Sequence, residues 1–320
     1  MITIICPVYN ESRYIKNVLD FYIGAMPHEK EMILVDGSST DDTCAIIKSY
    51  AEKHPGIKLL HNPKRYVPHS LNMALQQASG EIIIRMDAHT EYAEDYFEKI
   101  IETFKKSGAD IVGGPMRIAR GNFVQQAIGY ATSTIFGIGD SSFHFEDYEG
   151  FTDSVYLGAW KKHIFALTGV FDETLKRNQD DEFHYRARKN GFTIYQSPQI
   201  KLQYYPRDSF AKVFKQYYEY GLYKPFVLKK NKSAIRWRHL VPSMFVTYLV
   251  VVLAALLAPY YLLLIPLFCY ATLDAFFSIA SKKTFAVMWR IAVAYPVIHI
   301  AYGSGFIGGL LRMWLKRKEV

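Results

Sequence analysis

The sequence has few cysteines and lacks the short phosphate-binding motifs of several enzyme classes. Its 320 residues include three cysteines, and none of them form a metal-spaced pair. Because Cys6 and Cys269 lie in apolar runs, we expect free buried thiols in a reducing compartment. Neither a G-x-G-x-x-G sequence after the first predicted strand nor a Walker loop is present, so a bound diphosphate needs another partner. No signal peptide precedes the first strand, and we expect a cytoplasmic catalytic part.

Charged residues are also scarce near the C-terminus. From Leu240 to Leu311 the chain is almost entirely apolar, and runs of about 20 residues are long enough to cross a bilayer. We expect spans near 241–257 and 260–279. The third apolar stretch, 285–311, either spans the membrane or re-enters it. A single crossing there puts the basic C-terminus outside, against the positive-inside tendency.

The formal net charge of +8 is concentrated beside these apolar runs. Eight Lys or Arg residues and one acid, Glu219, lie between Lys212 and Arg238. Aromatic residues alternate with these cations, a pattern that predicts helices lying in the headgroup layer of the membrane. We expect these interfacial helices at residues 209–240. The alternative is a packed core helix with a solvated basic face. Because no nucleic-acid motif accompanies the cations, we expect membrane lipids as partners and no nucleic acid.

The N-terminal two thirds of the chain alternate between strand and helix patterns. Short β-branched runs predict strands at Ile2–Cys6, Glu31–Val35, Lys58–His61, Ile82–Met86 and Asp110–Gly113. The alternation predicts an α/β fold with a mostly parallel sheet and helices on both faces. We therefore divide the chain into a catalytic domain at 1–208, interfacial helices at 209–240 and a region of two or three membrane segments at 241–320.

Polar residues follow three of the predicted strands. Asp87 and His89 come directly after an apolar run, Asp36 and Ser38 follow the second strand, and Pro7 to Glu11 follow the first. Ligands of open α/β sheets bind at the carboxyl ends of the strands. Carboxylates there can accept hydrogen bonds from a base or a ribose, but turn and cap chemistry explains the same residues.

Asp87 and His89 also form a candidate ion site. A carboxylate favours Mg²⁺ or Mn²⁺, and a histidine ligand shifts the preference toward Mn²⁺. Together with Lys64, Arg65 or Arg85, such an ion would neutralise a diphosphate. The alternative is that Asp87 caps the following helix and His89 is solvated.

Three consecutive acids, Asp180, Asp181 and Glu182, open a predicted helix. Acids in a first helical turn favour the helix dipole, which explains one or two of them. The third has no evident structural purpose in the sequence. A carboxylate held near a hydroxyl could act as a general base, so we expect the acids to include a catalytic residue.

Taken together, these motifs resemble those of family 2 glycosyltransferases with the GT-A fold. The motifs are the segments Pro7–Glu11, Asp36–Ser38, Asp87–His89 and Asp180–Glu182. Their order and the membrane tail are most similar to bacterial exopolysaccharide glucosyltransferases of the succinoglycan type. The resemblance covers roughly residues 1–205.

The resemblance implies a UDP-sugar donor and a set of site residues. The expected donor site comprises Pro7, Tyr9, Asn10, Glu11, Asp36, Ser38, Arg65, Arg85 and Asp87. The resemblance itself implies Pro7, Tyr9, Glu11, Asp36 and Asp87. Asp36 is expected to face the uracil, and Asp87 to help bind the metal and the diphosphate. His89 stands where the family usually has a second aspartate, and its own chemistry makes it the other candidate ligand for Mn²⁺ or Mg²⁺. Asp180 matches the family's catalytic base, and Asp181 is the competing assignment.

The implied activity is inverting, metal-dependent transfer of a hexose, glucose above all, to a hydroxyl of a lipid-linked saccharide. The acceptor would be a polyprenyl diphosphate saccharide used in exopolysaccharide or cell-surface glycan synthesis. We expect a multi-pass protein of the cytoplasmic membrane with its catalytic domain facing the cytoplasm, working with other polysaccharide-assembly proteins. Two alternatives stay open: a polyprenyl-phosphate glycosyltransferase, and an inactive membrane scaffold of an assembly complex.

Overall fold

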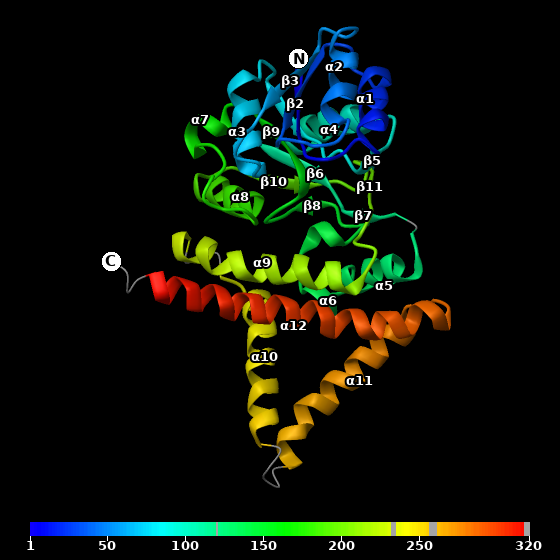
Figure 1. The fold of residues 1–320 in the computed structure, drawn as a ribbon, viewed down its shortest axis with the longest axis vertical. Helices are drawn as coiled ribbons and strands as arrows, with labels where there is room; N and C mark the ends of the chain where they lie inside the picture. The colour runs from blue at the N-terminus through cyan, green and yellow to red at the C-terminus, as the bar shows by residue number, and fades with distance from the viewer. Residues whose placement is uncertain (120, 232–234, 256–260, 317–320) are drawn as a thin grey trace. The chain divides into compact units, whose positions relative to one another are not determined.

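The structure, a computed structural model, describes residues 1–119, 121–231, 235–255 and 261–316 (Figure 1). The chain divides into two compact units. The first comprises residues 1–117 and 142–204, and the second comprises residues 118–141 and 205–320. Residues 118–141 therefore group with the C-terminal part of the chain, whereas the sequence analysis placed them inside a continuous catalytic segment.

The first unit is built on an eight-stranded sheet with the order β3-β2-β1-β4-β9-β6-β10-β8. Its strands are β1 (Ile2–Val8), β2 (Lys30–Asp36), β3 (Ile57–His61), β4 (Ile82–Arg85), β6 (Ile111–Gly114), β8 (Gly150–Phe151), β9 (Tyr156–Lys161) and β10 (Ile194–Gln196). β1 runs parallel to β2 and β4, β2 parallel to β3, and β6 parallel to β10. The prediction of a mostly parallel sheet is confirmed.

One central strand runs against this pattern. β9 pairs antiparallel with β4 on one side and with β6 on the other, and β8 adds a short antiparallel edge to β10. A second sheet has the order β5-β11-β7. It consists of β5 (Thr90–Tyr92), β11 (Leu202–Tyr204) and β7 (Arg117–Ile118). β9 separates the two parallel parts of the main sheet and was not predicted from the sequence.

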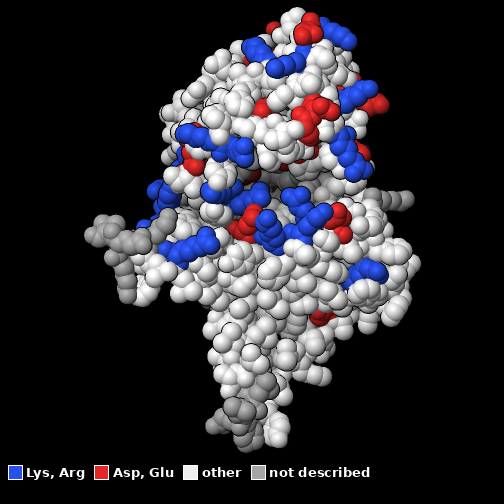
Figure 2. Space-filling view, in the orientation of Figure 1, with Lys and Arg blue, Asp and Glu red and all other residues white. Residues whose placement is uncertain are grey.

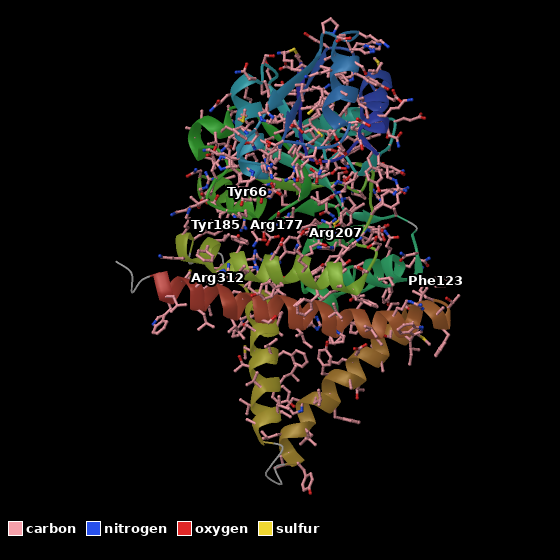
Figure 3. All side chains as sticks on the ribbon, in the orientation of Figure 1. Tyr66, Phe123, Arg177, Tyr185, Arg207 and Arg312 are labelled. Carbon is pink, nitrogen blue, oxygen red and sulfur yellow. The ribbon has the colours of Figure 1, made fainter. Side chains whose placement is uncertain are left out.

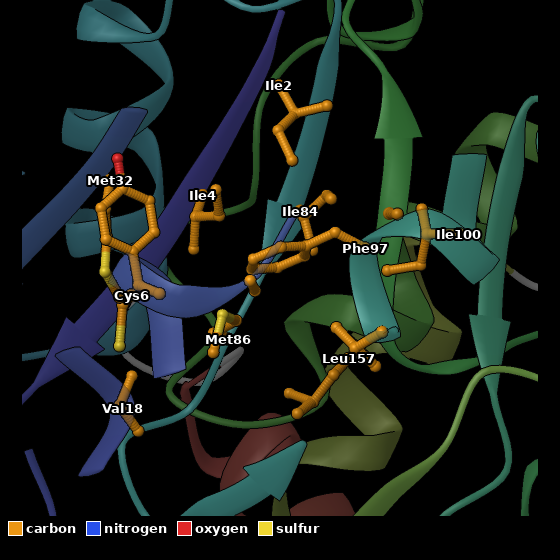
Figure 4. Close-up of a cluster of buried hydrophobic side chains, with 14 of the residues drawn as sticks. Ile2, Ile4, Cys6, Val18, Met32, Ile84, Met86, Phe97, Ile100 and Leu157 are labelled. Carbon is orange, nitrogen blue, oxygen red and sulfur yellow. The ribbon is translucent and has the colours of Figure 1, made fainter. Parts of the chain in front are cut away.

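Helices cover both faces of the main sheet because its strands alternate their buried side chains. Ile4 and Cys6 of β1 pack in one core cluster, and Ile5 between them packs in another. The first cluster joins the sheet to α1 (Ile15–Gly24), α2 (Thr43–Ala51) and α4 (Tyr96–Ser107). Figure 4 shows its interior, with Phe97 of α4 beside Ile84 of β4. The second joins the sheet to α3 (Val67–Gln77), α7 (Ile164–Thr168) and α8 (Gln179–Lys189).

The second unit is helical. Its helices are α5 (Phe123–Thr132), α6 (Ile135–Ile138), α9 (Phe210–Lys230), α10 (Trp237–Ala255), the short 3-10 helix η3 (Tyr261–Leu264), α11 (Ile265–Ala280) and α12 (Phe285–Lys316). α5, α9 and α12 share a buried core that includes Ile128, Val213, Ile291 and Tyr295. In Figure 1, α9 and α12 lie side by side, whereas α10 and α11 run away from them.

Glycines let α9 and α12 approach closely. A Cβ atom added at Gly305 would collide with the backbone carbonyl of Tyr218, and one at Gly221 with the carbonyl of Tyr302. Only glycine fits at such crossings, because any side chain would force the backbones apart. The glycine-rich end of the third apolar stretch therefore serves helix packing.

Three helical segments of the described residues are long and apolar enough to cross a membrane. They are Trp237–Ala254, Tyr261–Ala280 and Phe285–Leu315. They coincide with the three predicted apolar stretches, of which residues 256–260 lie outside the described part. Cys6 is buried as expected, but Cys269 on α11 is exposed, because its helix presents an apolar surface outward. The expectation of a buried thiol at position 269 was wrong.

Candidate active site

The loops that follow β1 and β2 are joined by hydrogen bonds. The backbone N–H of Asn10 donates to Ser39 Oγ at 2.9 Å, and the N–H of Thr40 donates to Asn10 Oδ1 at 2.8 Å. One residue further on, the N–H of Glu11 donates to Thr43 Oγ1 at 2.8 Å. The two predicted donor-site loops therefore form one continuous edge at the carboxyl ends of the strands.

Asp36 ends β2 with a buried carboxylate. Its oxygens accept from the backbone N–H groups of Ser38 at 3.0 Å and Ser39 at 3.1 Å. Burial raises the pKa of Asp36, but hydrogen bonds from Ser39, Cys44 and His61 outweigh it and hold the pKa below its usual value. The carboxylate is therefore ionised and fixed in direction. The sequence left two roles open for Asp36, ligand binding and stabilisation of a turn. The hydrogen bonds from Ser38 and Ser39 show that it stabilises the turn.

Three non-glycine residues at this edge adopt left-handed backbone conformations. Their φ angles are 56° at Asn10, 66° at Ser38 and 64° at Arg65. Such values are uncommon outside glycine and gather at functional sites. A Cβ atom at Gly37 would lie 3.6 Å from the Cα atom of Arg65, so the loop after β3 packs against the loop after β2. The side chain of Arg65 itself is exposed.

Pro7 and Tyr9 take less constrained positions. Pro7 lies within β1, opposite Val35, and is half-buried. Tyr9 follows the strand with 47% of its surface exposed, which leaves its ring available to a ligand at this edge.

Arg85 links two of the predicted site acids. Its Nη1 donates to Asp180 Oδ2 at 2.6 Å, while its Nε and Nη2 donate to Asp87 Oδ1 at 3.2 and 3.1 Å. Burial lowers the pKa of Arg85, but the charges of Asp180 and Asp87 outweigh it and raise the pKa above its usual value. The buried guanidinium is therefore charged. Arg85 was predicted to contact a diphosphate, and in the structure it donates hydrogen bonds to these carboxylates.

Asp180 stands in the first turn of α8. One oxygen, Oδ2, is held by Arg85. The other, Oδ1, is buried and accepts no hydrogen bond from any described residue. A buried carboxylate oxygen without a donor is costly, and each such case calls for an explanation. Asp181, the competing assignment, has its Oδ1 3.5 Å from Ser154 Oγ.

Glu182, the third acid of this cluster, has a structural contact. Arg186 donates from Nε to Glu182 Oε1 at 2.7 Å and from Nη2 to Oε2 at 2.8 Å. Arg186 also donates to the carbonyls of Thr168 and Val170, so the pair ties α8 to α7. Our expectation that the third acid lacks a structural purpose was wrong. The i, i+4 spacing from Glu182 to Arg186 is readable in the sequence.

His89 lies beside Glu11, which belongs to the β1 loop. The distance from His89 Nδ1 to Glu11 Oε1 is 3.1 Å. A neutral imidazole that donates from Nδ1 carries its lone pair on Nε2. Metal-binding histidines are commonly oriented by a carboxylate in this way. The contact therefore suits a ligand role for His89.

The donor set can be tested against a divalent ion. Within the described ranges, no three His, Cys, Asp or Glu side chains gather closely enough to hold an ion by themselves. Mg²⁺ and similar ions usually take one or two protein ligands and complete their shell with water and substrate phosphates. Asp87 and His89 fit that kind of site, in which the diphosphate supplies further oxygens.

Three residues near this site escaped the sequence analysis. The Tyr92 hydroxyl accepts from the backbone N–H of Asp87 at 2.8 Å and lies 3.1 Å from its carbonyl oxygen. The Nδ1 atom of His184 lies 2.9 Å from Ser154 Oγ, and burial lowers the His184 pKa despite nearby acids. A weak signal existed for His184, which is four residues after Asp180 on one helix face. Nothing in the sequence pointed to Tyr92 or Ser154.

Comparison with known proteins finds a matching family model and several relatives of this sequence. The sequence model of the family described as "Glycosyl transferase family 2" matches residues 3–156. The succinoglycan biosynthesis protein ExoA of Rhizobium meliloti (strain 1021) is 27% identical over 96% of this chain and 94% of its own length. A dolichyl N-acetyl-alpha-D-glucosaminyl phosphate 3-beta-D-2,3-diacetamido-2,3-dideoxy-beta-D-glucuronosyltransferase of Methanococcus voltae is 31% identical over 74% of this chain and 76% of its own.

Solved structures agree on the fold. The mannosyltransferase PcManGT from Pyrobaculum calidifontis, solved in complex with GDP-Man and Mn²⁺, has a TM-score of 0.68 at 20% identity, covering 97% of this chain and 87% of that chain. S. aureus TarS 1-349 in complex with UDP-GlcNAc has a TM-score of 0.53 at 17% identity, covering 97% and 92%. The chain belongs to glycosyltransferase family 2 and has the GT-A fold.

Proposed function

We propose that this protein is a membrane-anchored inverting glycosyltransferase that moves a hexose from a UDP-sugar to a hydroxyl of a lipid-linked saccharide. The hexose is glucose, and the product serves exopolysaccharide or cell-surface glycan synthesis. The proposal rests on the hydrogen bonding of the two carboxylate oxygens of Asp180. Arg85 holds one of its oxygens, and the other is buried without a hydrogen-bond donor among the described residues.

Asp180 is the proposed catalytic base. Its Oδ1 takes the proton of the acceptor hydroxyl while that oxygen attacks the anomeric carbon of the sugar. The new glycosidic bond forms as the bond to the diphosphate breaks, and UDP leaves with the electron pair. Because attack and departure occur on opposite faces, the anomeric configuration inverts. Asp181 is less suited to this role. Arg85 forms ion pairs with both Asp180 and Asp87, and this shared partner places the Asp180 carboxylate near Asp87.

The donor site is proposed at the joined loops after β1 and β2. The fixed, ionised carboxylate of Asp36 can accept an N–H of the uracil, and Tyr9 and Asn10 border the nucleoside. The left-handed conformations at Asn10, Ser38 and Arg65 let the backbone come close to the ligand. TarS was solved with UDP-GlcNAc, which supports a uridine donor.

A divalent ion, Mn²⁺ or Mg²⁺, is proposed at Asp87 and His89. When bound, it supplies positive charge to the departing diphosphate. Glu11 orients His89 for this role, and Arg85 orients Asp87. PcManGT was solved with GDP-Man and Mn²⁺, which supports an ion at this kind of site.

The acceptor and location are proposed from the C-terminal helices and the relatives. Helices apolar enough to span a membrane suit a substrate that is itself held in the membrane. ExoA is named for succinoglycan biosynthesis, and the Methanococcus voltae relative for a dolichyl-linked acceptor. The basic residues that flank the spans favour the cytoplasmic leaflet, so the catalytic domain faces the cytoplasm.

The proposal is tested with purified protein in lipid nanodiscs. The protein is incubated with Mn²⁺, extracted bacterial lipid-linked saccharides and each of a panel of UDP-sugars, and products are identified by mass spectrometry. We expect a mass gain of one hexose with UDP-glucose, and none with Asp180→Asn. Glu52→Gln, an exposed carboxylate at the end of α2, is the matched control and keeps full activity. Transfer to the lipid phosphate itself would instead identify a polyprenyl-phosphate glycosyltransferase.

A further inference from the structure

α12 differs from the other two candidate spans in how much of it is buried within the protein. For Phe285–Leu315 this share is 39%, against 6% for Trp237–Ala254 and 11% for Tyr261–Ala280. The N-terminal half of α12 belongs to the core that it shares with α5 and α9. Packing within the protein therefore explains part of its apolar character.

α9 packs against the second half of α12. Tyr218 meets Gly305 and Leu222 meets Gly309, so residues four apart on one helix contact residues four apart on the other. This register means that the two helices run side by side in the same direction, as Figure 1 shows. The close glycine crossings leave no room for lipid between them.

α9 cannot enter the hydrocarbon core at low cost. Its 21 residues, about 31 Å long at 1.5 Å per residue, include five lysines and Glu219 distributed from end to end. Charged side chains within the hydrocarbon are rare because their desolvation is expensive. A crossing by α12 would carry the charges of α9 with it, since the two helices are packed together.

α10 and α11 have the opposite character. From Val241 to Leu273 the sequence contains no Lys, Arg, Asp or Glu, and the one acid of α11, Asp274, is buried and accepts a hydrogen bond from Ser278. Arg238 precedes this segment and Lys282 follows α11. Figure 2 shows the same division: cations gather at the level of α9, and the visible surface of the α10 and α11 region is almost entirely uncharged. Both ends of the hairpin therefore favour the same leaflet.

A hydrogen bond between the two helices supports their insertion as one hairpin. The Tyr248 hydroxyl of α10 donates to the carbonyl of Leu263 at 2.5 Å and accepts from the N–H of Leu267 at 3.2 Å. These backbone groups lie where η3 meets α11, and backbone groups in lipid must find partners within the protein.

We propose that α10 and α11 insert as a single hairpin and that α12 lies with α9 along the cytoplasmic membrane surface. Both chain termini are then on the cytoplasmic side. The proposal rests on the membrane attachment proposed above and not on the catalytic assignment. α12 presents exposed apolar side chains to the bilayer, among them Trp289, Leu311 and Trp314. Tryptophan is enriched at such interfaces, and the lysines of α9 suit anionic headgroups.

The test is the labelling of single cysteines in the full chain with a membrane-impermeant maleimide in intact bacteria. Cys44→Ser and Cys269→Ser give the background, and the buried Cys6 is kept. The reporter is Arg312→Cys, which Figure 3 places toward the C-terminal end of α12. Lys16→Cys on α1 marks the catalytic unit, and Lys283→Cys marks the end of the hairpin; all three positions are exposed. A protein with a known external cysteine controls for labelling.

We expect all three cysteines to be protected in intact cells and labelled at least tenfold more after permeabilisation. Labelling of Arg312→Cys in intact cells, with Lys16→Cys protected, would show that α12 crosses the membrane and would overturn the inference. That result leaves the proposed catalysis intact. Recovery of the protein in the soluble fraction would overturn the inference together with the membrane attachment on which it rests.

Discussion

Arg85 Nη1 donates to Asp180 Oδ2 at 2.6 Å, although 95 positions separate the two residues in the sequence. The same guanidinium holds Asp87. One buried cation therefore fixes the carboxylate proposed as base and the carboxylate proposed to face the diphosphate. Their relative positions should depend on the planar fork of the guanidinium and not on positive charge alone.

Replacing Arg85 with lysine separates these two contributions. We expect Arg85→Lys to lower kcat by about 100-fold, because a displaced catalytic group costs about that much. The donor KM should change much less. Arg85→Met should also lower stability by about 3–5 kcal/mol, because it leaves two carboxylates without their partner. Steady-state kinetics and thermal unfolding check both; an unchanged kcat in Arg85→Lys would remove the positioning role.

Glu11 is expected to raise the affinity of the ion site for Mn²⁺, because it orients His89. We expect Glu11→Ala to raise the Mn²⁺ concentration for half-maximal activity by about 10–100-fold, the usual cost of losing a carboxylate that orients a metal ligand. Saturating Mn²⁺ should restore much of the lost rate. Titration of EDTA-treated protein with Mn²⁺ gives the measurement, with Glu52→Gln as control. Equal Mn²⁺ requirements in Glu11→Ala and the unmodified protein would exclude this coupling.

His184 should contribute to the pH dependence of stability. Burial lowers its pKa below the usual 6.5, so the unfolded chain binds the proton more readily. As the pH falls through about 6.5, the free energy of unfolding should therefore decrease, by at most about 1.4 kcal/mol per pH unit. His184→Gln should lack this component. Urea unfolding of both proteins between pH 5 and pH 8 measures the difference, and parallel curves would contradict the prediction.

The packing of α9 against α12 offers a matched pair of glycines. Gly305→Ala would place Cβ against the backbone carbonyl of Tyr218, whereas Gly308→Ala would meet only side-chain atoms, at 3.2 Å and beyond. Alanine ordinarily stabilises a helix by about 1 kcal/mol over glycine. We therefore expect Gly308→Ala to leave Tm unchanged or higher and Gly305→Ala to lower it. Thermal unfolding in detergent compares them; equal Tm values would argue against the close crossing.

Much of the architecture was predictable because it is local. Short apolar runs that alternate with helical stretches predicted the parallel sheet, and the long uncharged runs predicted the membrane helices. β9 was not predictable in the same way. Its position between β4 and β6 depends on which distant strands it meets, and its sequence carries no mark of an antiparallel direction.

The site was predictable to the level of its loops but not of its contacts. Asp36 and Asp87 were identified because each follows a strand, where the topology gathers ligands. The contact between Arg85 and Asp180, and that between His89 and Glu11, joins segments far apart in the chain. Glu182 lies in the first turn of α8, where acids are typical of capping, and its structural role comes from the i, i+4 pair with Arg186.

The central claim is that Asp180 removes the acceptor proton, and single-turnover transfer by Asp180→Asn tests it most directly. The variant is loaded with Mn²⁺ and UDP-glucose, its affinity for UDP is measured by calorimetry, and transfer to the lipid-linked saccharide is followed by mass spectrometry. We expect an unchanged affinity for UDP and a transfer rate at least 100-fold lower, the contribution typical of a general base. A transfer rate within a few fold of the unmodified protein would contradict the account.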